Sequence, residues 1–120
     1  MNKKTLVIGA SDNPERYSFK AANSLHNHGH EVVLFGKRSG TVIGQEIIKD
    51  RPILQNIDTV TLYINPDHQK EWVDYILSIK PKRVVFNPGT ENAEFEKLLQ
   101  QNNIEPMEAC TLVLLSIGDY

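Results

Sequence analysis

The sequence contains one cysteine, Cys110, in 120 residues. A single cysteine excludes an internal disulfide and fits a reducing compartment. Apolar runs are short as well, since none approaches the roughly 20 residues that cross a bilayer. Met1-Asn2-Lys3-Lys4 leads into a strand pattern without the apolar core of a signal peptide. These absences predict a cytoplasmic protein that has no membrane partner.

Charge of one sign is not in excess either, because the formal net charge is −2 at pH 7. Proteins that bind nucleic acid or anionic membranes usually carry a basic surplus, so we expect neither partner. The apolar fraction of 40% and the charged fraction of 23% are ordinary for a globular protein. The length suits one hydrophobic core, and we predict a single domain over residues 1–120.

Metal-ligand clusters and nucleophile–base pairs are also missing from the sequence. His26 and His30 are four residues apart, but Gly29 is expected to end the helix between them, and no carboxylate completes a ligand set. Cys110 has no base near it in the sequence that would activate its thiol. We therefore expect no metal and no catalytic residue, and the hypothesis leans away from an enzyme.

The sequence does contain a regular alternation of strand and helix patterns. Apolar and β-branched runs predict strands at 5–8, 31–35, 59–64, 83–87 and 104–109, and helical spacing predicts helices at 18–29, 65–80, 91–103 and 111–117. Residues 42–48 fit either a short strand or irregular chain. Alternation of this kind implies right-handed βαβ units. The predicted fold is α/β: a Rossmann-like, doubly wound, mostly parallel sheet of five strands in a single three-layer domain. Pro106 indicates that the last strand lies at an edge or is only partly paired.

The first strand ends in small residues, Gly9, Ala10 and Ser11, and a helix pattern begins near Ser18. In such a turn the backbone N–H groups and the positive end of the helix dipole point at one spot, which is how α/β proteins bind phosphate. Other predicted strands end at Gly36-Lys37-Arg38, at Asn65 and at Asn87-Pro88-Gly89. Because parallel strands end at the same edge of a sheet, we expect these segments to line one cleft for a phosphate-bearing cofactor.

Two missing features narrow the choice of cofactor. The turn lacks the second and third glycines of the dinucleotide motif G-x-G-x-x-G. The second strand is not followed by the acidic residue that binds the ribose of NAD, but by Lys37 and Arg38. Two cations there favour an additional ribose phosphate, which NADP carries at the 2′ position and coenzyme A at the 3′ position. The charges thus exclude NAD and leave the other two open.

The loop between the first strand and the first helix is longer than a dinucleotide turn. Residues 12–17 are expected to wrap around the ligand. Within this loop and at its end, Arg16 would bridge to a pyrophosphate and Ser18 would donate to it.

The pattern V-I-G-A-S-x-N-P-x-R-x-S, from Val7 to Ser18, resembles the opening of the CoA-binding domain family. These are small Rossmann-like proteins similar to the N-terminal domain of the succinyl-CoA synthetase α subunit. The resemblance continues at 28–32, 57–60 and 87–92, and Cys110 falls where the family has a cysteine. The chain departs from the family where Phe35-Gly36-Lys37-Arg38 stands in place of Pro-x-Asn-Pro, and Asn87 in place of Gln. The Met that usually follows the cysteine is also absent.

The resemblance implies coenzyme A, with its pyrophosphate at residues 9–11 and 16–18 and its adenosine near residues 36–38. The predicted cofactor-binding residues are Gly9, Ala10, Ser11, Asn13, Arg16, Ser18, Gly36, Lys37, Arg38, Asn65, Asn87, Pro88 and Gly89. The implied function is binding of coenzyme A or an acyl-CoA by a non-catalytic regulatory or accessory protein. The alternative is an NADP-binding reductase-like domain or a subunit of a larger enzyme. A homo-oligomer or a partner subunit stays open.

Overall fold

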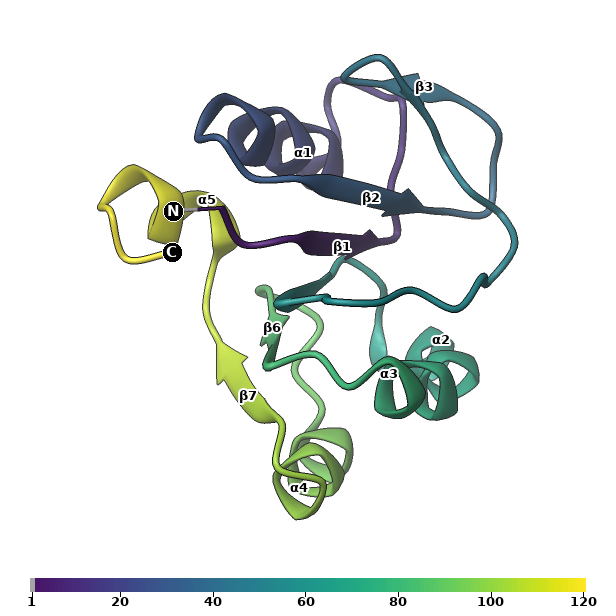
Figure 1. Cartoon of the computed structure of the whole chain (residues 1–120), viewed down its shortest axis with the longest axis vertical. Coiled ribbons are helices and arrows are strands. Elements are labelled where there is room, and N and C mark those ends of the chain that lie inside the picture. The colour runs from purple at the N-terminus through teal and green to yellow at the C-terminus, as the bar shows by residue number, and fades with distance from the viewer. Residues whose placement is uncertain (1) are drawn as a thin grey trace.

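The computed structural model describes residues 2–120 and contains one parallel sheet with the strand order β2-β1-β5-β6-β7 (Figure 1). The strands are β1 (Thr5–Ile8), β2 (Val32–Phe35), β5 (Thr59–Leu62), β6 (Arg83–Phe86) and β7 (Glu105–Glu108). The helices are α1 (Tyr17–Asn27), α2 (Pro66–Gln69), α3 (Val73–Ile79), α4 (Ala93–Gln101) and α5 (Thr111–Ser116), with a 3₁₀ turn η1 (Lys70–Trp72) between α2 and α3. The predicted Rossmann-like fold is confirmed, and β7, which contains Pro106, lies at an edge.

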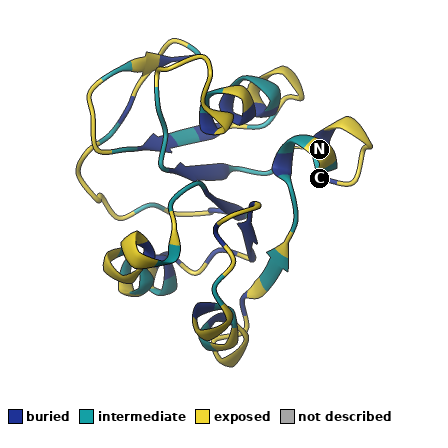
Figure 2. Cartoon of the chain, turned by 180° about the vertical axis from the view of Figure 1, so that it is seen from behind, coloured by how far each residue is buried: buried dark blue, intermediate teal, exposed yellow. Residues whose placement is uncertain are grey.

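Helices cover both faces of the sheet because successive strand residues point to opposite sides. Leu6 and Ile8 of β1 belong to a core closed by residues of α3 and α4, whereas Val7 packs with residues of α1 and α5. The central strands are buried on both faces, as the dark strands of Figure 2 show. Each large apolar side chain buried in these cores contributes about 1.5–3 kcal/mol to stability. Burial on both faces therefore explains the continuous apolar runs of β1 and β6.

The strand order changes direction at β1. From β1 the chain runs through α1 to β2 on one side, and it later returns to β5 on the other side of β1. Ile8, the last residue of β1, is therefore paired with both Phe35 and Leu62. Ligands of open α/β sheets bind at such a switch point, beyond the carboxyl ends of the strands.

The structure refines several predicted boundaries. Helix α1 begins at Tyr17, one residue before the predicted start, and Arg16 is its N-cap. Ser18 is therefore a buried residue of the first turn. The predicted helix at 65–80 is divided by η1. Its start is as expected, because the Asn65 side chain accepts from the His68 N–H and Pro66 occupies the first turn.

Residues 42–48, which fitted either a short strand or irregular chain, lie largely in a two-stranded antiparallel hairpin. Its strands are β3 (Thr41–Val42) and β4 (Gln45–Glu46). Its two turn residues, Ile43 and Gly44, have φ values of 50° and 73°. Two positive φ angles match the twist of a tight hairpin, but an isoleucine is rarely found there, which is why the sequence did not indicate the turn. Among residues 2–120, no helix combines the length and apolar character needed to cross a bilayer.

The residue Tyr120 is packed against the amino edge of the sheet. Its hydroxyl lies 2.6 Å from Thr5 Oγ1, and its backbone oxygen accepts from Arg83 Nη2 at 2.9 Å. The Arg83 guanidinium also stacks on the Tyr120 ring, 4.5 Å from the centroid, and donates to Thr59 Oγ1. These contacts satisfy a buried cation at the start of β6.

The carboxyl ends of β1, β2 and β5 approach one another so closely that glycine is required at two positions. Gly9 has a φ of +95°, and a Cβ there would lie 2.9 Å from the Tyr63 carbonyl oxygen. A Cβ on Gly36 would lie 2.5 Å from the Ala10 carbonyl oxygen. Side chains at these positions would push apart the strand ends that form the switch point.

Gly9→Ala should therefore be more costly than a comparable change elsewhere. Gly29 shares a positive φ of +84° but has open space around its missing Cβ, which makes Gly29→Ala the matched control. We expect Gly29→Ala to lower the free energy of unfolding by about 1 kcal/mol and Gly9→Ala by about 3 kcal/mol, because overpacking adds about 1–3 kcal/mol. Urea denaturation of both variants measures the difference, and equal losses would contradict the close approach at Gly9.

Candidate functional site

A cleft of about 1010 Å³ lies at the carboxyl edge of the sheet, toward which the arrowheads of β1 and β2 point in Figure 1. Its volume is near the upper end of the roughly 300–1,000 Å³ typical of small-molecule sites. Every predicted binding residue except Asn87 lines this cleft: Gly9, Ala10, Ser11, Asn13, Arg16, Ser18, Gly36, Lys37, Arg38, Asn65, Pro88 and Gly89. The fold thus brings segments far apart in the sequence to one surface.

The N–H groups nearest the end of β1 are already engaged. Those of Gly9 and Ala10 both donate to the Phe35 carbonyl oxygen, at 2.9 and 2.8 Å. The Asn13 N–H donates to Ser11 Oγ, and the Glu15 N–H to Asn13 Oδ1. The first residues of the loop therefore stabilise the loop itself.

The N-terminus of α1 offers the donors instead. Arg16 at the N-cap provides no side-chain acceptor to the helix. Within residues 2–120, the Tyr17 and Ser18 N–H groups have no hydrogen-bond acceptor. An uncapped helix start combines free donors with the positive end of the dipole, and here both face the cleft.

Cations outnumber acids along the cleft. The cationic side chains are Arg16, Lys37, Arg38, Lys49 and Arg51, and the acidic ones are Asp12, Glu15 and Glu71. Such a surplus favours an anionic ligand, in contrast to the net charge of −2 for the whole chain. Lys49 and Arg51 escaped the sequence analysis because they lie in an irregular segment that carries no periodic pattern.

Asn87, predicted as a binding residue, is buried and is not among the residues that line the cleft. Its side chain is 2% exposed and donates to Thr61 Oγ1 at 2.7 Å and to the Leu62 carbonyl at 2.9 Å. Its Oδ1 accepts from the Thr111 N–H at 2.9 Å. Strand alternation directs it to the same face as Val85, and its bonds to Thr61 and Thr111 show that it joins β5, β6 and α5.

A second buried amide, Gln69, holds two walls of the cleft together. Its Nε2 donates to the Ile64 carbonyl at 3.0 Å and to the Thr90 carbonyl at 2.7 Å. Its Oε1 accepts from Asn92 Nδ2 at 2.9 Å. All buried polar side chains among residues 2–120 are satisfied, so the loop walls are fixed by a complete network.

Tyr63 lies beside the cleft between β5 and α5. Burial raises the pKa of its phenol, which keeps the hydroxyl protonated as a donor near Thr111 and Thr61. Cys110 is partly buried and lies outside the cleft lining. Within residues 2–120 no group of three or more His, Cys, Asp or Glu side chains is arranged to hold a metal ion.

The loop that carries Gly89 is held by carboxylates. Glu91 Oε1 accepts from the Gly89 N–H at 2.8 Å, and Glu96 Oε2 accepts from the Asn92 N–H at 3.3 Å. Burial raises the pKa of the Glu96 carboxyl, and a hydrogen bond with the Glu108 carboxyl raises it further. The charge state of Glu96 is thus linked to the loop that forms one side of the cleft.

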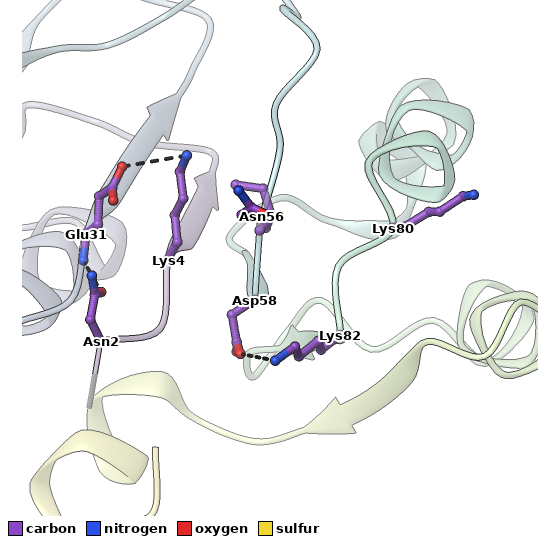
Figure 3. A pocket seen from close by; sticks show the side chains of 8 residues that line it. Asn2, Lys4, Glu31, Asn56, Asp58, Lys80 and Lys82 are labelled. Carbon is purple, nitrogen blue, oxygen red and sulfur yellow. Dashed lines mark hydrogen bonds and ion pairs between the residues drawn. The ribbon is translucent and has the colours of Figure 1, made fainter.

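A second hollow, of about 570 Å³, lies at the opposite, amino edge of the sheet (Figure 3). Lys4 is paired there with Glu31 at 3.6 Å, and Lys82 with Asp58 at 3.8 Å. Lys80 points away from these pairs (Figure 3). Two of the three lysines that line this hollow are thus each paired with a carboxylate, which reduces the positive charge open to a ligand there.

Comparisons with known proteins agree with this geometry. A family model described as "CoA binding domain" matches residues 3–116. No curated protein matches the chain. A crystal structure of an uncharacterized protein is 52% identical, with 100% of this chain and 99% of that chain covered and a TM-score of 0.98.

More distant structures share the fold. A protein from Thermus thermophilus is 20% identical, with 98% of this chain and 90% of that one covered and a TM-score of 0.86. A dinucleotide-forming acetyl-coenzyme A synthetase 1 from Ca. Korarchaeum cryptofilum, solved in complex with phosphate and ADP, is 15% identical, with a TM-score of 0.65. The matched part covers 89% of this chain and 26% of the synthetase chain.

The raised pKa of Glu96 predicts a pH dependence of stability. The folded chain holds this proton more tightly than the unfolded chain, so stability falls as the pH rises from the ordinary value of 4.5 through the raised one. Glu96→Gln removes the titration and should gain stability relative to the parent chain between about pH 5 and about pH 8. Urea denaturation at both pH values measures this, with Glu105→Gln on the exposed part of β7 as the control. A difference between Glu96→Gln and the parent chain that is the same at both pH values would contradict the linkage.

Proposed function

The chain belongs to the CoA binding domain family, and from this premise we propose that it binds coenzyme A or an acyl-CoA in the cleft at the carboxyl edge of its sheet. Its role is that of a regulatory or accessory protein that performs no chemistry of its own. The observation that carries the proposal is the coincidence, in one cleft, of an uncapped helix N-terminus and a surplus of cations. Coenzyme A carries a pyrophosphate and a separate 3′-phosphate, and it needs both features.

The pyrophosphate binds at the start of α1. The Tyr17 and Ser18 N–H groups donate to its oxygens, and Arg16 supplies a charge-assisted contact from the preceding residue. Gly9 contributes indirectly, because its missing side chain leaves room for the Tyr63 carbonyl and lets the strand ends that form the cleft come together. The hydrogen bonds support donation from Tyr17 and Ser18 and not from the turn, since the Gly9 and Ala10 N–H groups already donate to the Phe35 carbonyl.

The 3′-phosphate binds at the end of β2, where Lys37 and Arg38 are both exposed. An acid at this position would repel that phosphate, and the chain has none there. The same cations also suit the 2′-phosphate of NADP, so a reductase-like NADP-binding domain, or a subunit of a larger enzyme, is the second candidate.

Parallel titration calorimetry with coenzyme A, acetyl-CoA, NADP and NAD tests the proposal. We expect coenzyme A and acetyl-CoA to bind, with NADP at least tenfold weaker because the chain belongs to the CoA binding domain family. NAD should bind more weakly still, because it has no ribose phosphate for Lys37 and Arg38 to contact. Turnover is not expected when acetyl-CoA is incubated with the protein. Binding of NADP without binding of coenzyme A would overturn the choice in favour of the second candidate.

Removal of the cations at the end of β2 should reduce affinity only where a 3′-phosphate is present. The double variant Lys37→Ala/Arg38→Ala is expected to bind coenzyme A about 10- to 100-fold more weakly. This is a loss of about 1.4–2.7 kcal/mol for the pair, because both side chains are exposed and each contributes less than a fully formed charge-assisted hydrogen bond. Its affinity for dephospho-CoA, which lacks that phosphate, should change less than threefold. Lys97→Ala, on the exposed side of α4, serves as a control for loss of positive charge. Equal losses for the two ligands would remove Lys37 and Arg38 from the 3′-phosphate site.

A further inference from the structure

Arg51 presents a flat cation to the cleft. It lies in the irregular segment between β4 and β5, and its guanidinium stacks on Trp72 with its central carbon 3.9 Å from the ring centroid. Both residues line the cleft that also contains Lys37 and Arg38. Because the indole covers one face of the guanidinium, the opposite face is the one left for a ligand.

The guanidinium is held in one orientation by Glu71. Nη1 donates to the Glu71 carbonyl at 2.6 Å, and Nη2 donates to Glu71 Oε1 at 3.1 Å. An exposed arginine normally samples many rotamers, and ordering it upon binding costs about 0.5–1.5 kcal/mol. Here that order exists before the ligand arrives, although the side chain keeps 36% exposure.

Trp72 is fixed in its turn by an aromatic cluster. Its ring centroid lies 5.7 Å from that of Phe35 and 5.9 Å from that of Tyr75. The Tyr75 hydroxyl donates to the Pro52 carbonyl at 2.5 Å, which ties α3 to the segment that carries Arg51. The layers Phe35, Trp72 and Arg51 thus form a rigid stack that reaches from the core to the cleft.

We propose that Arg51, backed by Trp72 and oriented by Glu71, is the stacking platform for the adenine base. This inference rests on the proposed function. It assigns a binding residue to the adenine base, whereas Lys37 and Arg38 after β2 are assigned to the ribose phosphate. Guanidinium planes stack on heteroaromatic bases, and a base has no charge that would require the remaining cations. The adenine then lies beside the ribose phosphate held by Lys37 and Arg38.

A different role for Arg51, as one more phosphate-binding charge, makes a separate prediction. Arg51→Lys keeps the charge and loses the plane. Since Nη1 and Nη2 both donate to Glu71, phosphate binding would use Arg51 as a point charge, and a lysine would then leave affinity nearly unchanged. The platform requires a loss restricted to ligands that contain adenine. The comparison therefore uses coenzyme A, 3′,5′-ADP, and 4′-phosphopantetheine, which has no base.

Titration calorimetry of the parent chain and Arg51→Lys with these three ligands tests the platform. We expect Arg51→Lys to weaken coenzyme A and 3′,5′-ADP about 5- to 100-fold, as for loss of one base stack, and to leave 4′-phosphopantetheine within twofold. Trp72 is the only tryptophan of the chain, so its fluorescence should respond to the two adenine ligands and not to 4′-phosphopantetheine. Thermal unfolding verifies that the variant is folded.

The outcomes separate this proposal from the one on which it rests. If neither coenzyme A nor 3′,5′-ADP binds the parent chain, the proposed function and the platform both fall. If coenzyme A binds equally well to the parent chain and to Arg51→Lys, the platform alone is overturned. The same holds if the variant loses affinity for 4′-phosphopantetheine as strongly as for coenzyme A, since the effect is then independent of the base.

Discussion

Backbone contact between the ends of β1, β2 and β5 is the constraint on which the site depends. The Phe35 carbonyl accepts from both the Gly9 and Ala10 N–H groups, and the space for a Cβ on Gly9 is occupied by the Tyr63 carbonyl. The chain must therefore leave the sheet before it can begin α1, which is why an extended loop separates the strand from the helix. It follows that the free donors stand at Tyr17 and Ser18, at the helix, and not at the glycine turn.

Buried amides provide the second level of support. The Asn87 side chain bonds to β5 and α5, and the Gln69 side chain bonds to the loops after β5 and β6. These amides supply hydrogen-bond partners to backbone groups that have none in a regular helix or strand. An unpaired buried group costs about 1–3 kcal/mol, which means that the network permits few alternative loop positions. Loops held in this way keep the charged side chains of the cleft in fixed positions, so less conformational entropy is lost when a ligand binds.

The sequence predicted the strands and their shared carboxyl edge well, because burial on two faces leaves continuous apolar runs such as Leu6, Val7 and Ile8. The helices were predicted from the helical spacing of their apolar residues. The sequence also predicted which strand ends would meet, since that follows from the rule for parallel sheets. It missed the contact between Arg51 and Trp72. Arg51 lies in an irregular segment without a periodic pattern, and the helical spacing at 65–80 does not indicate what Trp72 contacts. Asn87 was assigned to the ligand because an amide at a strand end looks the same in sequence whether it faces the cleft or α5. Strand alternation decides between the two, but only when the register is known.

The distribution of charge within the cleft argues for a ligand with phosphates at separate points. Of the three acids, Glu71 is bonded to Arg51, which leaves Asp12 and Glu15 in the loop before α1. Because the Glu71 carboxylate pairs with Arg51, it does not neutralise Lys37 and Arg38, which line the cleft after β2. Arg16 lines the cleft from a different element, at the start of α1. A ligand with only one anionic centre would satisfy one of these groups and leave the other hydrated. A ligand with a pyrophosphate and a separate ribose phosphate matches both, and a flat guanidinium between aromatic core and cleft suits the base attached to that ribose.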